Sequence, residues 1–378
     1  MDGVDSSVAA IILQNQGYEV IGATMNLWEH DTKKTENSVS DDAKKVCKEL
    51  GIEHYTLDFK KEFKECVIKN FIETYNKAMT PNPCIQCNKY MKFDCFYKKA
   101  LELKCDYIAT GHYAKTEYSK EYNQYVLKKS KAGKKDQSYV LYNIPNEMIE
   151  KIIFPLGEFE NKEEIRKIAE EHNLNVAKKP DSEDICFIPD NDYVGFLNKN
   201  SNIKQIPGNI VTKNGKVLGK HNGLINYTIG QRKGLGISNA TPLYVIELDK
   251  DKNQVVVGEE KDIYSKELYA NNVNFTLNIE IASKIEVQAK IRYNSNASEA
   301  MLYVLDKDKV KLEFKEPQRA ITKGQSVVFY IDDIVLRWRN NYLNKRRWYN
   351  ERTERYNINF YCNLCSDITH CSCYTCNC

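Results

Sequence analysis

DSSVAAIILQNQG at residues 5–17, followed by YEVIGATM at residues 18–25, decides the fold of this chain. Val8, Ile11 and Ile12 share one face of a helix over residues 5–16, and Gly17 is typical of a residue that ends a helix. The run over residues 18–25 is apolar and β-branched enough to predict a strand. A short helix that leads directly into such a strand is the unit from which α/β domains are built.

The same alternation continues through the first half of the chain. It predicts an α/β, Rossmann-like domain over residues 1–190, with a parallel sheet covered by helices on both faces. The expected elements are helices over residues 41–50, 61–77 and 88–103 and strands over residues 54–59 and 106–109.

Beyond Pro189 the pattern changes to short strands joined by turns. Residues 211–218 form a hairpin pattern around Asn214-Gly215, a strong hairpin turn, and residues 243–258 form a second one. Alternating polar and apolar residues continue over residues 268–336. We therefore expect two small all-β, barrel-like domains, over residues 200–260 and 265–336.

Composition narrows the class of protein. The 378 residues are 42% apolar and 28% charged, and no run of 18 apolar residues is present, so we expect no membrane association. The acidic N-terminus differs from a signal peptide, which makes the cytoplasm the expected location and reduced thiols the expected state of the 13 cysteines. Residues 337–378 hold seven Lys or Arg and three Asp or Glu, so the rest of the chain has a net charge of −1. Bulk charge thus gives no argument for nucleic acid.

Two cysteines stand in polar, Pro-rich or acidic surroundings. Cys87 ends the stretch TPNPCIQC, and Cys186 lies in DSEDICFIP, contexts that we interpret as turns or loop edges, where a thiol is accessible. The alternative is a pair of buried structural thiols. Cys84 adds a second choice: it is either a bystander beside Cys87 or the third thiolate, with Cys87 and Cys186, of a metal or iron–sulfur site.

Small and hydroxyl residues open the first helix, at Gly3-Val4-Asp5-Ser6-Ser7. Backbone N–H groups at a helix N-terminus favour a phosphate, whereas Asp and Ser at the same place also serve as ordinary N-caps. These five residues alone leave both interpretations open.

Ordered motifs along residues 3–336 give the chain a family resemblance. The first motif resembles the phosphate loop of the PP-loop ATP pyrophosphatases, and the series as a whole resembles the bacterial tRNA 2-thiouridylases of the MnmA family. The matching stretches are Gly3 to Ser7, Thr24 to Trp28, Thr80 to Pro83, Cys87 to Lys89, Ala109 to Tyr113, Lys135 to Tyr139, Asp181 to Phe187 and Gly230 to Gly236.

The resemblance implies a sulfurtransferase that uses ATP with Mg²⁺ to adenylate the wobble uridine of a tRNA and then replaces the oxygen by sulfur. It implies Cys186 as the persulfide carrier and Cys87 as the nucleophile, joined by a transient Cys87–Cys186 disulfide. Asp181, Glu183 and Asp184 would raise the pKa of the Cys186 thiol, so we expect a cation or a helix end near it.

The resemblance also implies binding residues and partners. A cysteine desulfurase or sulfur-relay protein would supply the persulfide, and no tightly bound cofactor or metal is expected. The residues implied for ATP are Gly3, Val4, Asp5, Ser6, Ser7, Met25 and Gly111, and those implied for tRNA are Asn82, Pro83, Cys84, Lys135, Asp136, Gln137, Arg292 and Tyr293.

Both ends of the sequence depart from the family pattern. Met1 and Asp2 take the places of the loop's Ser and first Gly, and no strand precedes the loop, so we expect weak ATP binding. For residues 337–378 a frameshifted, disordered tail competes with a zinc module that would use Cys362 and Cys365. Two other functions stay open: a tRNA-binding protein without catalysis, and a thiol-redox or iron–sulfur protein.

Overall fold

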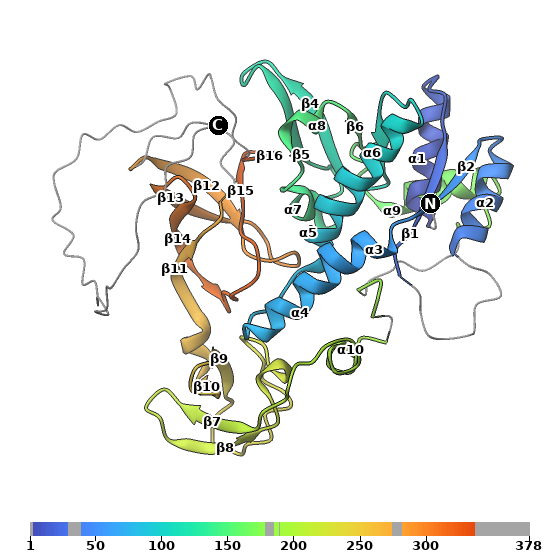
Figure 1. The fold of residues 1–378 in the computed structure, drawn as a ribbon. Coiled ribbons are helices and arrows are strands. Elements are labelled where there is room, and N and C mark those ends of the chain that lie inside the picture. The colour runs from blue at the N-terminus through green and yellow to red at the C-terminus, as the bar shows by residue number, and fades with distance from the viewer. Residues whose placement is uncertain (1–2, 29–38, 178–184, 189, 274–281, 337–378) are drawn as a thin grey trace, which may run out of the picture.

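The computed structural model describes residues 3–28, 39–177, 185–188, 190–273 and 282–336. Helices and short parallel strands make up most of the first part of the chain, and two mainly antiparallel β modules follow it (Figure 1). This arrangement confirms the predicted α/β domain with two small β domains behind it. The expectations for Met1, for Asp2, for residues 181–184 and for residues 337–378 fall outside the described residues.

Helix α1 (Val4–Asn15) and strand β1 (Gly22–Asn26) form where the opening stretch predicts them, although the strand starts later than expected. Its ladder begins at Gly22 because the parallel partner β2 (His54–Asp58) reaches only that far. A second parallel pair joins β3 (Ile108–Ala109) to β6 (Ile152–Ile153). The expectation of one parallel sheet was therefore too simple, because the described residues form two separate pairs.

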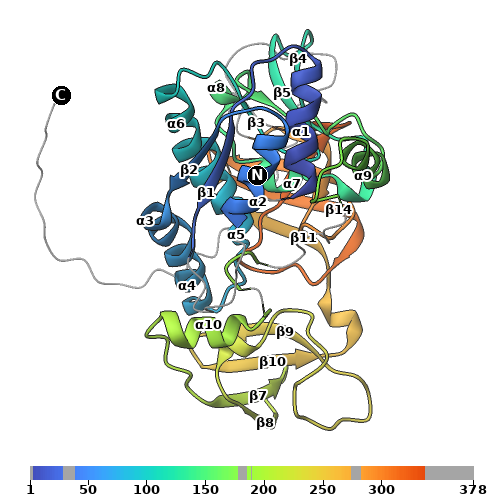
Figure 2. The ribbon, with the colours of Figure 1, turned by 90° about the vertical axis from the view of Figure 1, so that its right-hand side faces the viewer.

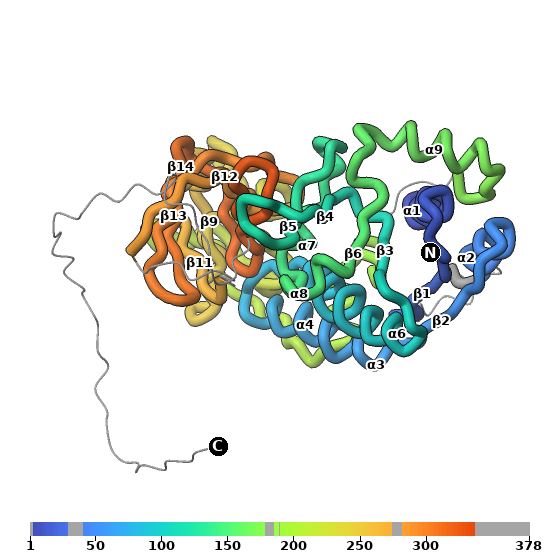
Figure 3. The backbone as a smooth tube through the Cα atoms, turned by 90° about the horizontal axis from the view of Figure 1, so that it is seen from above, coloured from blue at the N-terminus to red at the C-terminus, as the bar shows by residue number. Residues whose placement is uncertain are grey.

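Helices cover these strands on two sides. Seen from above, α1 and α9 (Lys162–Glu171) lie on one side of β3 and β6, and α6 (Phe96–Glu102) lies on the other (Figure 3). Asn161 caps α9 by accepting the N–H of Glu164 at 3.1 Å. The other short helices of this half are α2 (Val39–Glu49), η3 (Gly133–Lys135), α7 (Ser138–Leu141) and α8 (Asn146–Ile149).

Two helical runs contain π-helical turns. The first comprises α3 (Lys60–Phe63), η1 (Lys64–Ile68) and α4 (Lys69–Asn76), as the sequence predicts. The second comprises α5 (Pro83–Gln86), η2 (Cys87–Cys95) and α6. It begins five residues before the predicted start because Pro83 takes the first helical position after extended Asn82.

The C-terminal module shares its sheet with the first domain. Hairpin strands β4 (Ala114–Ser119) and β5 (Gln124–Lys129) extend an eight-stranded sheet, through a pairing of Ile334 with Lys128. Figure 3 shows β5 lying between the barrel strands and β3. The barrel strands are β11 (Tyr264–Ala270), β12 (Lys284–Lys290), β13 (Ser298–Asp306), β14 (Lys309–Arg319), β15 (Val328–Ile331) and β16 (Ile334–Val335).

The central module is a four-stranded sheet with the order β8-β7-β10-β9. Its predicted hairpin turn is confirmed at Gly215, whose φ of +80° suits glycine. Helix α10 (Tyr193–Asn200) joins it to the first domain (Figure 2). The strands are β7 (Gly208–Thr212), β8 (Val217–His221), β9 (Tyr244–Asp249) and β10 (Gln254–Gly258), with 3₁₀ turns η4 (Leu224–Asn226) and η5 (Glu260–Ile263). No helix within the described ranges has the length and apolar character needed to span a membrane.

Candidate active site

Cys84 and Cys87, which are close in sequence, lie near the distant Cys186 in the structure. Cys84 lies on α5, Cys87 begins η2, and Cys186 lies in a turn closed by the N–H of Ile188 donating to the carbonyl of Ile185 at 2.7 Å. Burial raises the pKa of Cys186 most, and charge on Cys87 and on Cys84 raises it further, so the three sulfurs lie within electrostatic range of one another. Like the other described cysteines, all three are free thiols.

The Cys186 turn is fixed by the side chain that follows it. Phe187 is buried, with its ring centroid 5.6 Å from that of Phe63 and 5.4 Å from that of Phe71. Met91 of η2 belongs to the same core cluster, and Cys87 packs against it. A single aromatic core therefore holds the Cys186 turn and the Cys87 helix together.

Cys87 lies in a helix, which corrects the expectation that its context is a turn or loop edge. The prolines of the preceding segment suggest a turn, but proline at the first helical position costs no hydrogen bond and initiates the helix instead. Cys87 is half-buried, whereas Cys84 and Cys186 are exposed. The Asn88 side chain anchors this turn by donating to the carbonyl of Val140 at 3.1 Å.

Burial raises the pKa of all three thiols, to about 11 for Cys87 and about 12 for Cys186. Although Cys84 and Cys186 are exposed residues, the protein atoms crowded around the three thiols solvate a thiolate less well than water does. Lys92 acts in the opposite direction and lowers the pKa of each thiol. The cation expected near Cys186 is therefore confirmed, and it is Lys92.

Lys92 is itself held by a buried histidine. Its Nζ lies 3.1 Å from Nε2 of His112, and Nδ1 of His112 lies 2.7 Å from Oγ1 of Thr110. An ammonium group only donates, so Nε2 accepts and Nδ1 carries the ring proton that is donated to Thr110. Burial, followed by the charge of Lys92, holds the pKa of His112 well below its ordinary value, and the ring is neutral.

Most of the residues expected to bind ATP lie around the start of α1. A Cβ on Gly111 would lie 2.7 Å from Asp5 C and from Ser6 N, so only glycine allows this close approach. Asp5 accepts a hydrogen bond from the Tyr113 hydroxyl at 2.9 Å and one from Lys162 at 3.0 Å. The N–H groups of a first helical turn have no partner within the helix, and together with the close approach of Gly111 they fit an anion such as a phosphate.

The other expected nucleotide residues have mixed roles. The hydroxyls of Ser6 and Ser7 both donate to the carbonyl of Gly3, at 3.1 and 3.0 Å, as N-terminal serines commonly do. Val4 is buried in a core cluster with Val8. Met25 lies on β1 and packs against the same aromatic core as Cys87.

The residues expected to bind tRNA lie near the thiols, on the side of the C-terminal barrel. Tyr293 has a hydrogen bond to Gln137, and charge on Asp136 and on Cys84 raises its pKa after the larger effect of burial. Lys135 contributes a smaller, opposite effect on the same hydroxyl. The structure therefore brings this expected set together beside Cys84.

Several members of this set make internal contacts. The buried Asp136 carboxylate accepts the N–H of Ser130 at 2.9 Å and the Ser138 hydroxyl at 2.6 Å, which fixes the loop before α7. Gln137 accepts the N–H of Tyr113 at 3.0 Å. Their role in shaping the site is thus visible in the protein alone.

Arg292 and Lys290 complete the barrel side. The Arg292 guanidinium donates to the carbonyls of Arg319 and Ala320 at 2.5 and 2.7 Å. Lys290 lies 5.5 Å from the ring centroid of Tyr293, and burial lowers its pKa. Cations beside an accessible tyrosine are the combination that binds RNA phosphate and stacks an unpaired base.

A loop of the C-terminal barrel also forms hydrogen bonds with the segment that leads to Asn82, Pro83 and Cys84. Gln325 Nε2 donates to the carbonyls of Thr80 and Pro81 at 3.0 and 3.1 Å, and the N–H of Thr80 donates to the carbonyl of Lys323 at 2.9 Å. Gly324 has a φ of +94°, and a Cβ there would lie 2.8 Å from the Thr80 oxygen. We call this contact between residues 323–325 and 80–81 the barrel clamp.

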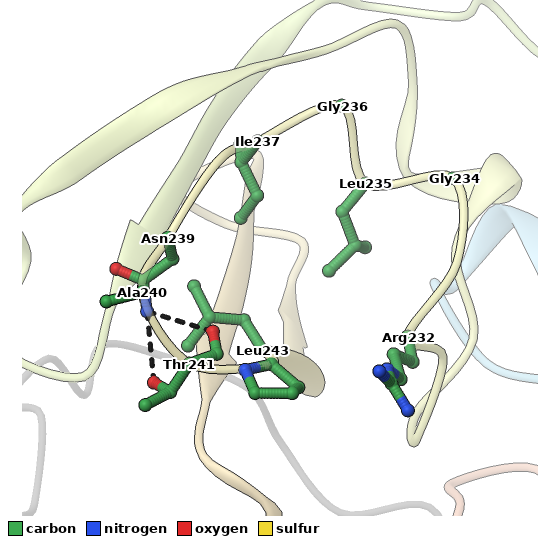
Figure 4. Close-up of a pocket in the computed structure, with 10 residues that line it drawn as sticks. Arg232, Gly234, Leu235, Gly236, Ile237, Asn239, Ala240, Thr241 and Leu243 are labelled. Carbon is green, nitrogen blue, oxygen red and sulfur yellow. Dashed lines mark hydrogen bonds between the residues drawn. The ribbon is translucent and has the colours of Figure 1, made fainter.

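One hollow of about 370 Å³ lies away from the thiols, in the central module. Its walls are a glycine-rich loop that includes Arg232, Leu235 and Ile237, and its only charged lining residue is Arg232 (Figure 4). It contains no nucleophile or acid–base pair, so we assign no chemistry to it. Within the described ranges, no group of three or more His, Cys, Asp or Glu side chains is placed to hold a metal ion.

Four contributors to the site were not predicted from the sequence: Lys92, His112, Lys290 and Gln325. His112 had the clearest signal, because it directly follows Gly111 at the end of a strand, where α/β domains place functional side chains. Lys92 stands five residues after Cys87, a spacing that carries no meaning on an ordinary α-helix and brings the two one turn apart on a π-helix.

Comparison with known proteins covers almost all of the described chain. Residues 1–190 match the family described as tRNA methyl transferase HUP domain, residues 195–259 its PRC-barrel domain, and residues 265–336 the aminomethyltransferase β-barrel domain. Similar curated proteins include the tRNA-specific 2-thiouridylases MnmA of Acetivibrio thermocellus, 49% identical over 342 residues, and of Clostridioides difficile, 48% identical over 340 residues. The MnmA of Caldicellulosiruptor saccharolyticus is 50% identical over 342 residues. Each alignment covers 88% of this chain and 94–95% of the relative.

Proposed function

Because this chain belongs to the MnmA family of tRNA-specific 2-thiouridylases, we propose that it replaces the C2 oxygen of the wobble uridine of a tRNA by sulfur. ATP, with its Mg²⁺, is the second substrate in this proposal. One observation carries it: Gly111 packs on the start of α1, while the next residue, His112, holds the lysine that faces the three thiols. A nucleotide at α1 and a sulfur at Cys186 would thus lie on either side of one short segment.

The first step in the proposal activates the base. The uridine O2 attacks the α-phosphorus of ATP, pyrophosphate leaves, and the oxygen becomes part of a good leaving group, AMP. The N–H groups of the first turn of α1 would hold the phosphates through the helix dipole. Tyr293 would stack on the exposed base, and Asn82, Pro83 and Cys84 would contact it.

The second step delivers sulfur. A cysteine desulfurase or relay protein would leave a persulfide on Cys186, an exposed residue that a protein donor can reach. The Cys87 thiolate attacks the inner sulfur, which forms the Cys87–Cys186 disulfide and expels hydrosulfide; hydrosulfide then adds at C2 and AMP departs with the oxygen. If the terminal sulfur adds to C2 first, the same attack by Cys87 releases the product. In either order a thiol reductant returns both cysteines to thiols.

The test is ATP-dependent formation of 2-thiouridine in an unmodified tRNA transcript, measured by nucleoside mass spectrometry with a persulfide donor present. Cys87→Ser and Cys186→Ser should abolish the product. Cys105→Ser, a half-buried thiol outside the site, is the matched control and should retain it. Retention in Cys84→Ser supports the bystander interpretation, and loss supports a third functional thiol.

Other outcomes separate the competing functions. Binding of tRNA with no thiolation under any sulfur supply would refute the proposal in favour of a catalytically impaired tRNA-binding protein. A coloured protein after anaerobic purification, with thiol chemistry indifferent to ATP, would refute it in favour of a redox or iron–sulfur protein. The proximity of Cys84, Cys87 and Cys186 makes this second measurement worthwhile.

A further inference from the structure

The helix that carries Cys87 departs from α-helical winding at one place. From Cys87 to Cys95 it is π-helical, and the N–H of Phe96 donates to the carbonyl of Met91, five residues back. Residues five apart are thereby stacked one turn from each other. Cys87 and Lys92 have this spacing, so the π-helical winding brings the Lys92 side chain over the turn that begins with Cys87. Such turns are frequent at functional sites.

The Lys92 ammonium group has a defined partner and direction. His112 Nε2 accepts from it at 3.1 Å, and the half-buried lysine makes no ion pair with any carboxylate in the part of the chain that the structure describes. Among the described residues, therefore, its positive charge is not paired with a carboxylate. It acts on Cys84, on Cys87 and on Cys186 together.

His112 is buried and neutral. Only 8% of it is exposed, and its ring centroid lies 6.2 Å from that of Phe93 and 6.0 Å from that of Phe154. Thr110 Oγ1 accepts a hydrogen bond from the Nδ1–H group, which leaves the Nε2 lone pair facing Lys92. A carboxylate in this place would neutralise the lysine, whereas an imidazole orients it and leaves its charge available to the thiols.

We propose that Lys92 is the cation that favours the thiolate forms of Cys87 and Cys186, and that His112 is the positioning residue that aims it at them. The thiols need such a cation because burial and their mutual repulsion both oppose ionisation. The consequence for sulfur transfer rests on the proposed function. The electrostatic inference itself concerns the free protein and is tested without tRNA or ATP.

The experiment measures the rate at which each cysteine of the reduced, full-length chain reacts with iodoacetamide between pH 7 and 10, resolved by peptide mass spectrometry. Lys92→Gln keeps a hydrogen-bond donor for His112 and removes the charge. Alkylation of Cys87 and of Cys186 should fall about tenfold at a given pH, because a neighbouring opposite charge shifts a pKa by about one unit or more. Lys92→Arg should keep most of the rate.

Lys98→Gln is the matched control. Lys98 lies on the same continuous helical run, is mostly exposed, and lowers the pKa of Cys95 rather than that of the site thiols. Its loss should slow alkylation of Cys95 and leave Cys87 and Cys186 unchanged. Equal slowing of the site thiols by Lys98→Gln and Lys92→Gln would overturn the proposal, as would an unchanged rate in Lys92→Gln.

The role of His112 is tested by a pair of variants. His112→Leu removes the acceptor and should slow Cys87 and Cys186 as much as Lys92→Gln does, with no further loss in the double variant. His112→Gln offers an amide oxygen to the lysine and should restore much of the rate. His112 does not position Lys92 if His112→Leu leaves the alkylation rates of both thiols unchanged. The same conclusion follows if His112→Leu and His112→Gln, at matched melting temperatures, reduce both rates equally. Failure of tRNA thiolation would bear on the proposed function alone.

Discussion

Replacing Gly324 by alanine should open the barrel clamp. The backbone there has a φ of +94°, and a Cβ would lie 2.8 Å from the oxygen and 2.9 Å from the nitrogen of Thr80. The positive φ costs an alanine about 1 kcal/mol, and forcing a methyl group against backbone costs about 1–3 kcal/mol more. We therefore expect Gly324→Ala to lose about 2–4 kcal/mol in the stability of this contact.

The rate of amide hydrogen exchange measures this loss of stability at the contact itself. The Thr80 amide is the reporter, since it donates to the carbonyl of Lys323 across the contact. Gly215→Ala is the matched control: its φ is +80°, and a Cβ there meets nothing within 4 Å, so it measures the cost of the positive φ alone. The loss of about 2–4 kcal/mol in Gly324→Ala should accelerate exchange of the peptide around Thr80 by about 30- to 900-fold.

Two results would contradict this reasoning. Exchange around Thr80 that stays at the wild-type rate in Gly324→Ala would mean that the contact relaxes without strain. A loss of global stability in Gly215→Ala as large as that in Gly324→Ala would assign the whole effect to backbone conformation. Because the clamp holds the residues just before Asn82, the opened variant should also thiolate tRNA with a lower kcat/KM.

Three further predictions follow from other contacts. Gly111→Ala should weaken ATP binding at least about fivefold, by calorimetry, because the added Cβ displaces the first turn of α1 by the same overpacking. Lys290→Gln should reduce the salt dependence of tRNA binding by about one unit of slope, whereas an unchanged slope would place Lys290 away from phosphate. Burial lowers the pKa of both His112 and His54 below 6.5, so the unfolded chain binds more protons than the folded chain near this pH. The urea concentration at the midpoint of unfolding should therefore decrease as the pH is lowered from 7.5 to 5.5. An increase would contradict this reasoning.

Local patterns were sufficient for most of the secondary structure. The face formed by Val8, Ile11 and Ile12 predicts α1, and the Asn214-Gly215 turn predicts its hairpin, because both depend on residues close in sequence. The pairing of the β4–β5 hairpin with the C-terminal barrel was missed. It joins Lys128 to Ile334 across more than 200 residues, and no local pattern specifies which distant edge a hairpin will complete.

The candidate site divides in the same way. Cys186 lies in a turn, as its polar context predicts, and Gly111 packs closely on the start of α1, where only glycine fits. Lys92 and His112 were missed because their meaning depends on a helical winding and on a burial that only the folded chain provides. Cys87 was placed in a loop because Asn82-Pro83 was interpreted as a turn rather than as the start of a helix.

The placement of Lys92 explains why a site with raised thiol pKa values is suited to sulfur transfer. A thiol whose pKa is about 11 is almost fully protonated at neutral pH and is protected from alkylation and oxidation. The same thiolate, once formed, is a stronger nucleophile than one of low pKa, because nucleophilicity rises with basicity. A cation held by His112 that lowers the cost of ionisation lets Cys87 combine both properties. In this arrangement the neutral ring of His112 is as important for thiolate formation as the charge of Lys92, because it positions the ammonium group without neutralising it.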